Sequence, residues 1–205
     1  MICLVITVRM VCNKRMTITL LAKKGGVGKS TLSVLLYEAF RQAKKSAAIR
    51  DWDPQGTSNR ALKFIGGEKA AVGQEYDILI YDTPPSLDHT ATAAGVMAAD
   101  VALVVTTPSP ADLWEAENAV QFVMKKNPRA AARIVFNRVR KTTVLGRLIE
   151  ESAKQLSVPS LTASLSNREC YQHAIGQGWK ALDGPAREEV FRLATDVLAV
   201  KALKK

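Results

Sequence analysis

The segment from Lys24 to Thr31, Lys-Gly-Gly-Val-Gly-Lys-Ser-Thr, combines the residue types that bind phosphate groups. Glycines let successive backbone N–H groups turn toward phosphate oxygens, and the N-terminus of a following helix adds partial positive charge. Lys29 has the reach to contact β and γ phosphates, the Ser30 hydroxyl can hold Mg²⁺, and Thr31 can contact the α phosphate. The segment therefore predicts a loop that binds ATP together with magnesium.

Two further segments place carboxylates where chemistry at a phosphate could use them. Asp51 and Asp53 end or follow the apolar run at 46–51, and Asp82 ends the run at 76–82. In a parallel sheet the carboxyl ends of the strands form the edge that binds ligands. We expect Asp82 to hold magnesium through a water molecule, as the acid at the end of such a strand does in nucleotide hydrolases.

The elements that must position these residues follow from the hydrophobic pattern. Short apolar runs rich in β-branched residues alternate with helical patterns, which is typical of strands buried on both faces and joined by crossover helices. The runs lie at 17–22, 46–51, 76–82, 101–107, 132–137 and, more weakly, 157–163. Helices are expected from the glycine loop to about residue 43 and at about 111–126, 143–156 and 186–203. The fold class is therefore α/β, a doubly wound, mostly parallel sheet with helices on both faces.

The chain of 205 residues suits a single domain, which we expect at 16–205. Residues 1–15 are apolar for about a dozen positions, too few to span a bilayer, and they lack the features of a signal peptide. They are either an upstream, mis-started extension or an extra edge strand. The three cysteines form no metal-ligand or disulfide pattern, which favours the reducing cytoplasm.

The formal net charge of +10 is unevenly distributed. Residues 125–205 carry nine of these ten net charges, so the base excess lies in the C-terminal part. Such an asymmetry indicates a polyanionic partner, either nucleic acid or acidic lipid. Ordinary solvated lysines and arginines on helix surfaces are the alternative explanation.

The loop departs from the common pattern GxxxxGK[ST], because Lys23 stands where the first glycine is expected. Its form, KGGxGK[ST], resembles the deviant Walker A motif of the ParA/MinD family of ATPases, whose fold is that of a P-loop NTPase. The resemblance implies that Gly25, Gly26, Val27 and Gly28 bind the nucleotide with Lys29. It also implies that Lys24 reaches the phosphates of the partner subunit in a nucleotide-sandwich homodimer, as an arginine finger does.

Other segments extend the resemblance over most of the chain from Met16 onward. The segment DWDPQ resembles the family's DxDPQ, in which the carboxylate matching Asp53 positions or activates the attacking water. The catalytic residues are then Lys24, Lys29 and Asp53. The segment IVFNRV resembles the strand whose end contacts adenine, so Asn137 either contacts the base or caps its strand. The segment NRECYQHAIGQG resembles a late family segment, and it gives no functional assignment.

Members of this family have several functions, and the sequence disfavours some of them. The iron protein of nitrogenase needs cluster-ligating cysteines at other places, and cobyrinate-type synthesis needs an additional amidotransferase domain. Membrane association of the MinD kind is not expected, because the apolar residues of the last helix form one stripe that suits packing on the sheet, namely Val190, Phe191, Ala194, Val197 and Leu198. Small ParA-type proteins bind DNA non-specifically, and few aromatic residues accompany the basic ones, which favours contacts to the DNA backbone. The candidate DNA-binding residues are Arg138, Arg140, Lys141, Arg147, Lys180 and Lys201, with Lys204 and Lys205 beyond them.

The resemblance thus implies a nucleoid-associated ATPase of the cytoplasm that forms an ATP-dependent dimer on non-specific DNA. Hydrolysis, stimulated by DNA and by an adaptor protein on a cargo, would segregate or position that cargo. A plasmid or chromosome locus, a protein organelle such as the carboxysome, and a chemoreceptor cluster are all open as cargo. The alternatives are a MinD-like positioning ATPase at the membrane and a nucleotide-dependent switch or scaffold without significant turnover.

Overall fold

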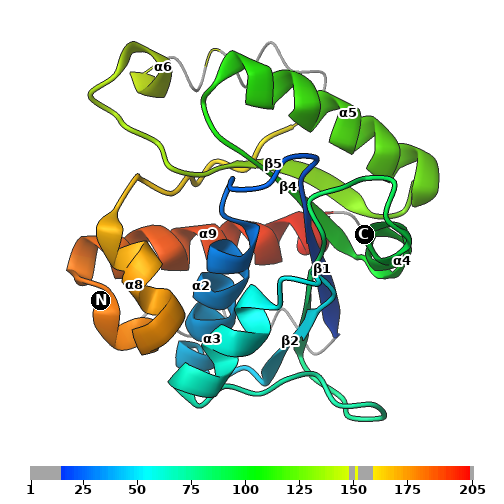
Figure 1. The fold of residues 1–205 in the computed structure, drawn as a ribbon, viewed down its shortest axis with the longest axis vertical. Coiled ribbons are helices and arrows are strands. Elements are labelled where there is room, and N and C mark those ends of the chain that lie inside the picture. Colours follow the sequence, from blue (N-terminus) through cyan, green and yellow to red (C-terminus); the bar gives the residue numbers. More distant parts are fainter. Residues whose placement is uncertain (1–14, 148–150, 152–158, 204–205) are drawn as a thin grey trace.

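The computed structural model describes residues 15–147, 151 and 159–203. Its centre is a sheet of parallel strands in the order β2-β3-β1-β4-β5 (Figure 1). The strands are β1 (Met16–Leu21), β2 (Ala47–Asp51), β3 (Ile78–Asp82), β4 (Val101–Thr106) and β5 (Ala131–Phe136). The strand that precedes the phosphate loop, β1, therefore lies in the middle, between β3 and β4.

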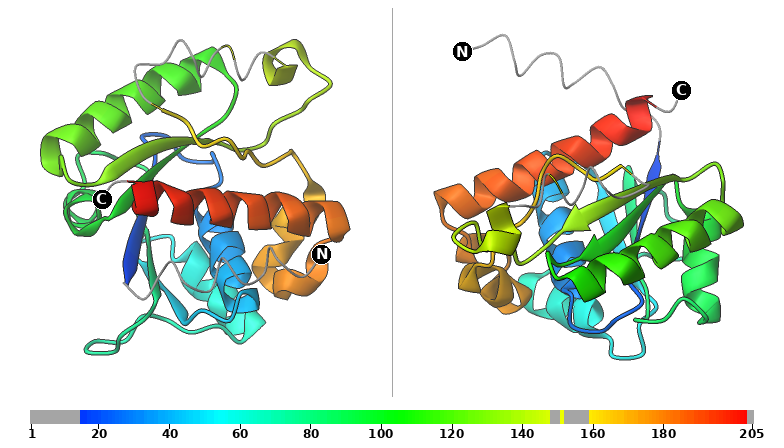
Figure 2. Two further views of the ribbon diagram at one scale, coloured as in Figure 1. Left: turned by 180° about the vertical axis from the view of Figure 1, so that it is seen from behind. Right: turned by 90° about the horizontal axis from the view of Figure 1, so that it is seen from above.

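Helices cover both faces of the sheet (Figure 2). On one face α2 (Lys29–Gln42) packs beside α9 (Gly184–Leu203), with α3 (Thr57–Ile65) and α8 (Glu169–Gln177) next to α2. On the other face α4 (Thr90–Ala98) contacts β1, and α5 (Pro110–Lys126) contacts β4 and β5. Every residue of β4 is buried, as expected for a strand between two helical layers. The doubly wound α/β fold is confirmed.

Most of the expected elements are found close to their expected places. The helix expected after the glycine loop is α2, and those expected at 111–126 and 186–203 are α5 and α9. The apolar stripe of α9 packs on the sheet, since Val190, Ala194 and Val197 are buried, together with Leu193. Phe191 departs from that stripe, because it is 39% exposed and lies edge-on against the ring of Trp179.

The sixth expected strand, at 157–163, is not formed by its described residues, 159–163. Ser160 makes a single parallel bridge with Ile134, and the Leu161 N–H donates to the Ile134 carbonyl at 2.8 Å. Pro159 has no N–H to donate, which interrupts the ladder at the edge of the sheet. The helix expected at 143–156 begins as α6 (Val144–Arg147), and most of the remainder lies outside the described residues.

The proposed extension at 1–15 also lies outside the described residues, except for Arg15. Of the helices in the described part of the chain, none is long and apolar enough to cross a membrane.

Candidate nucleotide-binding site

The phosphate loop connects the end of β1 to the start of α2. Gly26 and Gly28 have φ angles of 79° and 96°, in the left-handed region that side-chain-bearing residues rarely adopt. Gly28 precedes the first residue of α2, Lys29, so the loop leads directly into a helix N-terminus. The predicted arrangement of strand, glycine loop and helix is therefore present, with its backbone N–H groups available to phosphate oxygens.

Asn137, directly after β5, holds this loop from the side. Its side-chain Nδ2 donates to the Val27 carbonyl at 2.8 Å, and its Oδ1 accepts from the Arg138 N–H at 2.9 Å. A Cβ on Gly28 would lie only 2.3 Å from Nδ2, so the close approach requires glycine there. Asn137 thus positions the phosphate loop in this structure, and its contact with adenine stays a prediction.

Lys29 is buried at the base of the loop, with 6% of its surface exposed. Burial lowers the pKa of its ammonium group, while the negative charges of Asp82 and Asp53 oppose that shift. The fold therefore brings the loop lysine near both carboxylates that the sequence pattern selected. A bound polyphosphate would add the anionic partner that a buried ammonium group requires.

Asp82 ends β3 and is completely buried. Among the described residues, no group forms a hydrogen bond with either of its carboxylate oxygens. Burial raises its pKa from 3.8 to about 6; the nearby Ser30 and Ser58 hydroxyls oppose the shift, and the Asp51 carboxylate adds to it. A buried carboxylate without a partner, beside a loop hydroxyl, fits a divalent cation held by Asp82 and Ser30.

The two carboxylates at the end of β2, Asp51 in the strand and Asp53 just after it, differ in role. Asp51 lies opposite Asp82 in the sheet register and accepts hydrogen bonds from the Asp53 N–H at 3.0 Å and the Asn59 N–H at 2.8 Å. Asp51 therefore fixes the loop between β2 and α3. Asp53 is half-buried, and among the described groups its carboxylate accepts only from the Gln55 N–H, at 2.9 Å, which leaves that carboxylate capacity for a water molecule.

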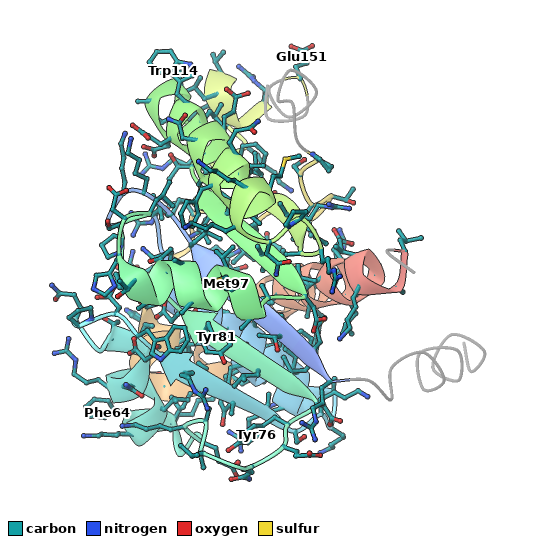
Figure 3. All side chains as sticks on the ribbon, turned by 90° about the vertical axis from the view of Figure 1, so that its right-hand side faces the viewer. Phe64, Tyr76, Tyr81, Met97, Trp114 and Glu151 are labelled. Carbon is teal, nitrogen blue, oxygen red and sulfur yellow. The ribbon has the colours of Figure 1, made fainter. Side chains whose placement is uncertain are left out.

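Lys24 has a partner within its own chain that the sequence did not indicate. Its Nζ lies 3.1 Å from Asp112 Oδ1, on the first turn of α5. The Thr107 hydroxyl donates to the other oxygen of Asp112 at 2.6 Å and holds that carboxylate in place. The neighbouring Lys23 pairs with Glu115 of the same helix, at 2.8 Å. Trp114, a residue of the same helix, is 68% exposed (Figure 3).

A cavity of about 490 Å³ opens at the carboxyl ends of β4 and β5. It is lined by residues of the segments that follow these strands, Thr107 and Pro108 after β4 and Arg138 and Arg140 after β5, and by Asn167 of the segment before α8. Arg140 holds the side chain of Asn167. In the amide orientation that satisfies the neighbouring groups, Nε and one terminal nitrogen of Arg140 donate to the Asn167 amide oxygen, at 2.9 and 3.1 Å. The size and location of the cavity suit the nucleoside of a bound nucleotide.

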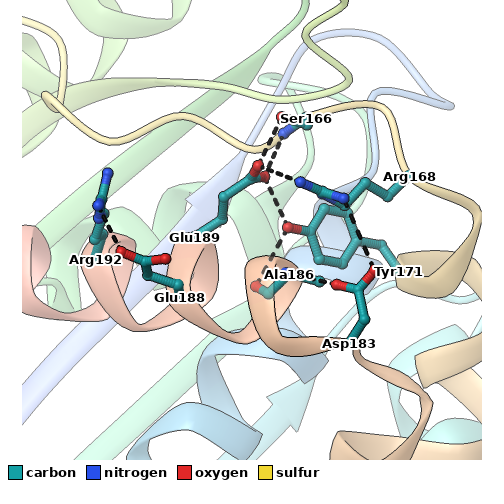
Figure 4. Close-up of polar contacts among 8 residues, drawn as sticks. All are labelled: Ser166, Arg168, Tyr171, Asp183, Ala186, Glu188, Glu189 and Arg192. Carbon is teal, nitrogen blue, oxygen red and sulfur yellow. Dashed lines mark hydrogen bonds and ion pairs between the residues drawn. The ribbon is translucent and has the colours of Figure 1, made fainter.

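The segment 166–171 is fastened to α9 by Glu189 (Figure 4). This carboxylate accepts from the Ser166 N–H at 2.9 Å, from a guanidinium nitrogen of Arg168 at 3.0 Å and from the Tyr171 hydroxyl at 2.8 Å. Burial raises the pKa of the Glu189 carboxyl, and the larger combined effect of these partners lowers it, so the group stays ionised. The late segment that resembled the family thus positions the wall of the cavity that contains Asn167.

The candidate DNA-binding residues do not form one surface. Arg138, Arg140, Lys141 and Arg147 follow β5 along the chain at the site's edge of the sheet, and Arg138 has a left-handed φ of 57°. Lys180 is exposed after α8. Lys201 pairs with Asp100 at 2.9 Å and donates to the Arg15 carbonyl, beside the start of β4 at the opposite edge. Lys204 and Lys205 lie outside the described residues.

Comparison with known proteins agrees with this geometry. The family model for the CobQ/CobB/MinD/ParA nucleotide binding domain matches residues 18–179. Maintenance of carboxysome distribution protein A of Halothiobacillus neapolitanus is 27% identical over 217 residues, covering 92% of this chain and 99% of the relative. The fold of the MinC:MinD cell division protein complex of Aquifex aeolicus is similar, with a TM-score of 0.74, 16% identity and coverage of 90% and 96%.

A putative plasmid partition protein of Borrelia burgdorferi, solved with AMPPNP bound, has a TM-score of 0.70 to this chain, with 17% identity and coverage of 91% and 98%. These structural similarities concern the fold, whereas the family match spans most of the sequence and includes the phosphate loop. The chain therefore belongs to the CobQ/CobB/MinD/ParA nucleotide-binding family and is an ATPase of the ParA/MinD type.

Proposed function

We propose that this ATPase forms an ATP-dependent homodimer on non-specific DNA and hydrolyses ATP to position a cargo, and that the cargo is the carboxysome. The observation that carries the proposal is the convergence of Lys24, Lys29, Asp53 and Asp82 at one edge of the sheet. The full-length similarity to two carboxysome distribution proteins, at 27% and 28% identity, supports this cargo over the alternatives.

The positions of the side chains support the following reaction. Lys29 and the loop N–H groups bind the β and γ phosphates of ATP, and Asp53 orients the water that attacks the γ phosphorus. Asp82 and Ser30 would hold Mg²⁺, which supplies positive charge to the phosphate oxygens when bound. Lys24 leaves Asp112 and contacts the phosphates of the partner subunit. Hydrolysis therefore depends on dimerisation and is slow in the isolated subunit.

Binding and release of DNA then follow the nucleotide cycle. The ATP dimer brings the arginines and lysines after β5 of two subunits onto one DNA segment, and contacts to backbone phosphates are additive and sensitive to salt. Hydrolysis separates the subunits, so each subunit alone makes half as many contacts with the DNA backbone as the dimer did. An adaptor protein on the cargo would accelerate this release where the cargo lies, so that bound dimers persist elsewhere and the cargo moves toward them.

Hydrolysis is tested by phosphate release from purified protein with Mg²⁺, ATP and duplex DNA, with Lys29→Ala as the control. We expect slow release that requires Mg²⁺ and rises with DNA and the adaptor, and no release above background from the control. Release by wild type that stays at the level of Lys29→Ala, with DNA and adaptor present, would contradict ATP turnover and favour the switch or scaffold.

The cargo is tested in the cells that produce the protein. Deleting its gene should change labelled carboxysomes from evenly spaced to clustered, and wild-type protein should restore the spacing while Lys29→Ala should not. Normal carboxysome spacing in the deletion strain would show that the cargo is a different one.

A further inference from the structure

Ser58 lies on the first turn of α3, and the nucleotide site described above gives it no function. Its side chain is completely buried, and its hydroxyl oxygen has no hydrogen-bond partner among the described residues. A buried hydroxyl without a partner is unfavourable, so such groups are rare unless a ligand or water completes their hydrogen bonds. Helix α3 runs from Thr57 to Ile65 and packs against β2.

The fold holds Ser58 against the carboxylate of Asp82. The next residue, Asn59, donates its N–H to Asp51 Oδ2 at 2.8 Å, and Asp51 is the register partner of Asp82. The Trp52 N–H donates to the Asp82 carbonyl at 2.8 Å and fastens the start of the same loop. The first turn of α3 therefore lies over the ends of β2 and β3.

Three polar side chains thus meet here, and two of them, Asp82 and Ser58, lack hydrogen-bond partners among the described residues. The Asp82 oxygens and the Ser58 hydroxyl are buried and lack partners in the described part of the chain, and Ser30 approaches the same carboxylate from the phosphate loop. A carboxylate with hydroxyls beside it is the hard oxygen environment that a hydrated Mg²⁺ or Mn²⁺ prefers. Water molecules on such an ion would bond to the unpartnered oxygens.

We propose that the Ser58 hydroxyl is an outer-shell positioning group for the divalent cation at Asp82. The Ser58 hydroxyl forms a hydrogen bond with a water molecule bound to that ion. Binding of the cation therefore also holds the loop that carries Asp53, which lies five residues before Ser58. This role rests on the proposed function, in which Asp82 and Ser30 hold the cation. Ser58 does not touch the reacting atoms, and it acts through the ion and the loop.

The test measures Mn²⁺ affinity by the electron paramagnetic resonance of free Mn²⁺, with ADP-bound protein. Ser58→Ala should weaken Mn²⁺ binding about tenfold, the lower end of the effect of losing an outer-shell partner. Its affinity for ADP without metal should equal that of wild type. Ser33→Ala is a matched control, because Ser33 is also completely buried and its hydroxyl lacks a partner in the described residues. It should bind Mn²⁺ as wild type does.

Asp82→Asn separates this proposal from the proposed function. Loss of Mn²⁺ binding in Asp82→Asn, with Ser58→Ala unchanged from wild type, would overturn the role of Ser58 alone. Unchanged Mn²⁺ binding in Asp82→Asn would overturn the cation site, and the Ser58 role with it. If Ser58→Ala does not fold by circular dichroism, Ser58→Cys, of similar volume and with a weak donor, decides the question in its place.

Discussion

Lys24 of the phosphate loop lies 3.1 Å from Asp112 of α5 in the same subunit. The two side chains are 44% and 20% exposed, so solvent screens the pair and its contribution is small, about 0.2–1 kcal/mol. In the proposed dimer Lys24 contacts the partner subunit's phosphates. The ion pair within the chain therefore competes with dimerisation, and its weakness permits the exchange.

Removing the charge of Asp112 should favour the dimer. Asp112→Asn eliminates the competing ion pair in both subunits, so we expect ATP-dependent dimerisation to tighten by about two- to thirtyfold, the range that two such pairs allow. Light scattering with a slowly hydrolysed ATP analogue measures this shift. Glu115→Gln is the matched control, because it breaks the neighbouring pair with Lys23 and leaves Lys24 bound to Asp112. Equal behaviour of the two variants would contradict competition at Lys24.

Removing Lys24 should separate nucleotide binding from hydrolysis. Lys24→Ala keeps Lys29 and the glycine loop, so its affinity for ADP should match that of wild type. Its phosphate release should fall at least about a hundredfold, because a cation supplied by the partner subunit accelerates phosphoryl transfer by about a thousandfold or more. Hydrolysis at the wild-type rate by Lys24→Ala would rule out the trans-acting role.

Asp53 should be needed for hydrolysis and dispensable for assembly. Asp53→Ala removes the group that orients water, so phosphate release should fall by about a hundredfold or more while ATP still binds. The expected consequence is a dimer that remains on DNA, measured as slow dissociation after ATP is diluted. Rapid release of Asp53→Ala from DNA, at the wild-type rate, would show that hydrolysis does not control dissociation.

The buried carboxylate of Asp82 should make stability depend on pH. Its folded-state pKa of about 6 lies above the unfolded value of 3.8, so the protonated acid favours the folded state. This favourable contribution is complete below about pH 4 and is lost as pH rises toward 6, by up to about 3 kcal/mol. Without metal and nucleotide, Asp82→Asn should therefore unfold at a higher temperature than wild type at pH 7.5.

The same comparison at pH 5 provides the control. There most of the Asp82 population is protonated in the folded state, so the advantage of Asp82→Asn should shrink. A difference between the two proteins that is the same at both values of pH would contradict a raised pKa at Asp82.

The DNA-binding candidates should differ in importance according to their surroundings. Arg147 is exposed after β5, whereas the ammonium of Lys201 is matched by Asp100 at the other edge of the sheet. Arg147→Gln should lower the slope of log affinity against log salt by about 1.8, the effect of one lost phosphate contact in each subunit of the dimer, and Lys201→Gln should leave it unchanged. ATP affinity should be unaltered in both. A larger loss of slope in Lys201→Gln would place the DNA surface elsewhere.

Local patterns were sufficient to predict the parts of the fold that depend on neighbouring residues. The strand and glycine loop that lead into α2 carry strong signals in sequence order, and so does the long apolar run of β4. The shorter helices α3, α4 and α8, of nine residues each, were not predicted. Short segments have weak periodicity, and their stability comes from packing against other elements.

Contacts between distant segments could not be predicted from one sequence. Asn137 bonds Val27 across 110 residues, and Glu189 joins three groups from a segment that precedes it by about twenty residues. The position of Asp112 is typical of the first turn of a helix, because it follows a proline that can begin a helix. Its pairing with Lys24 depends on β1 lying beside β4 in the sheet, which a local pattern does not indicate. Ser58 gave none, because a buried serine has no distinctive pattern.

The most direct test of the central claim is binding to non-specific duplex DNA with ATP, with ADP and without nucleotide, over a series of salt concentrations. The account predicts binding that requires ATP, is absent in Lys29→Ala and weakens steeply as salt rises. Binding that is equal in all three nucleotide states would contradict control by the ATP dimer. No binding in any state, with association to anionic liposomes instead, would contradict the DNA-based mechanism itself.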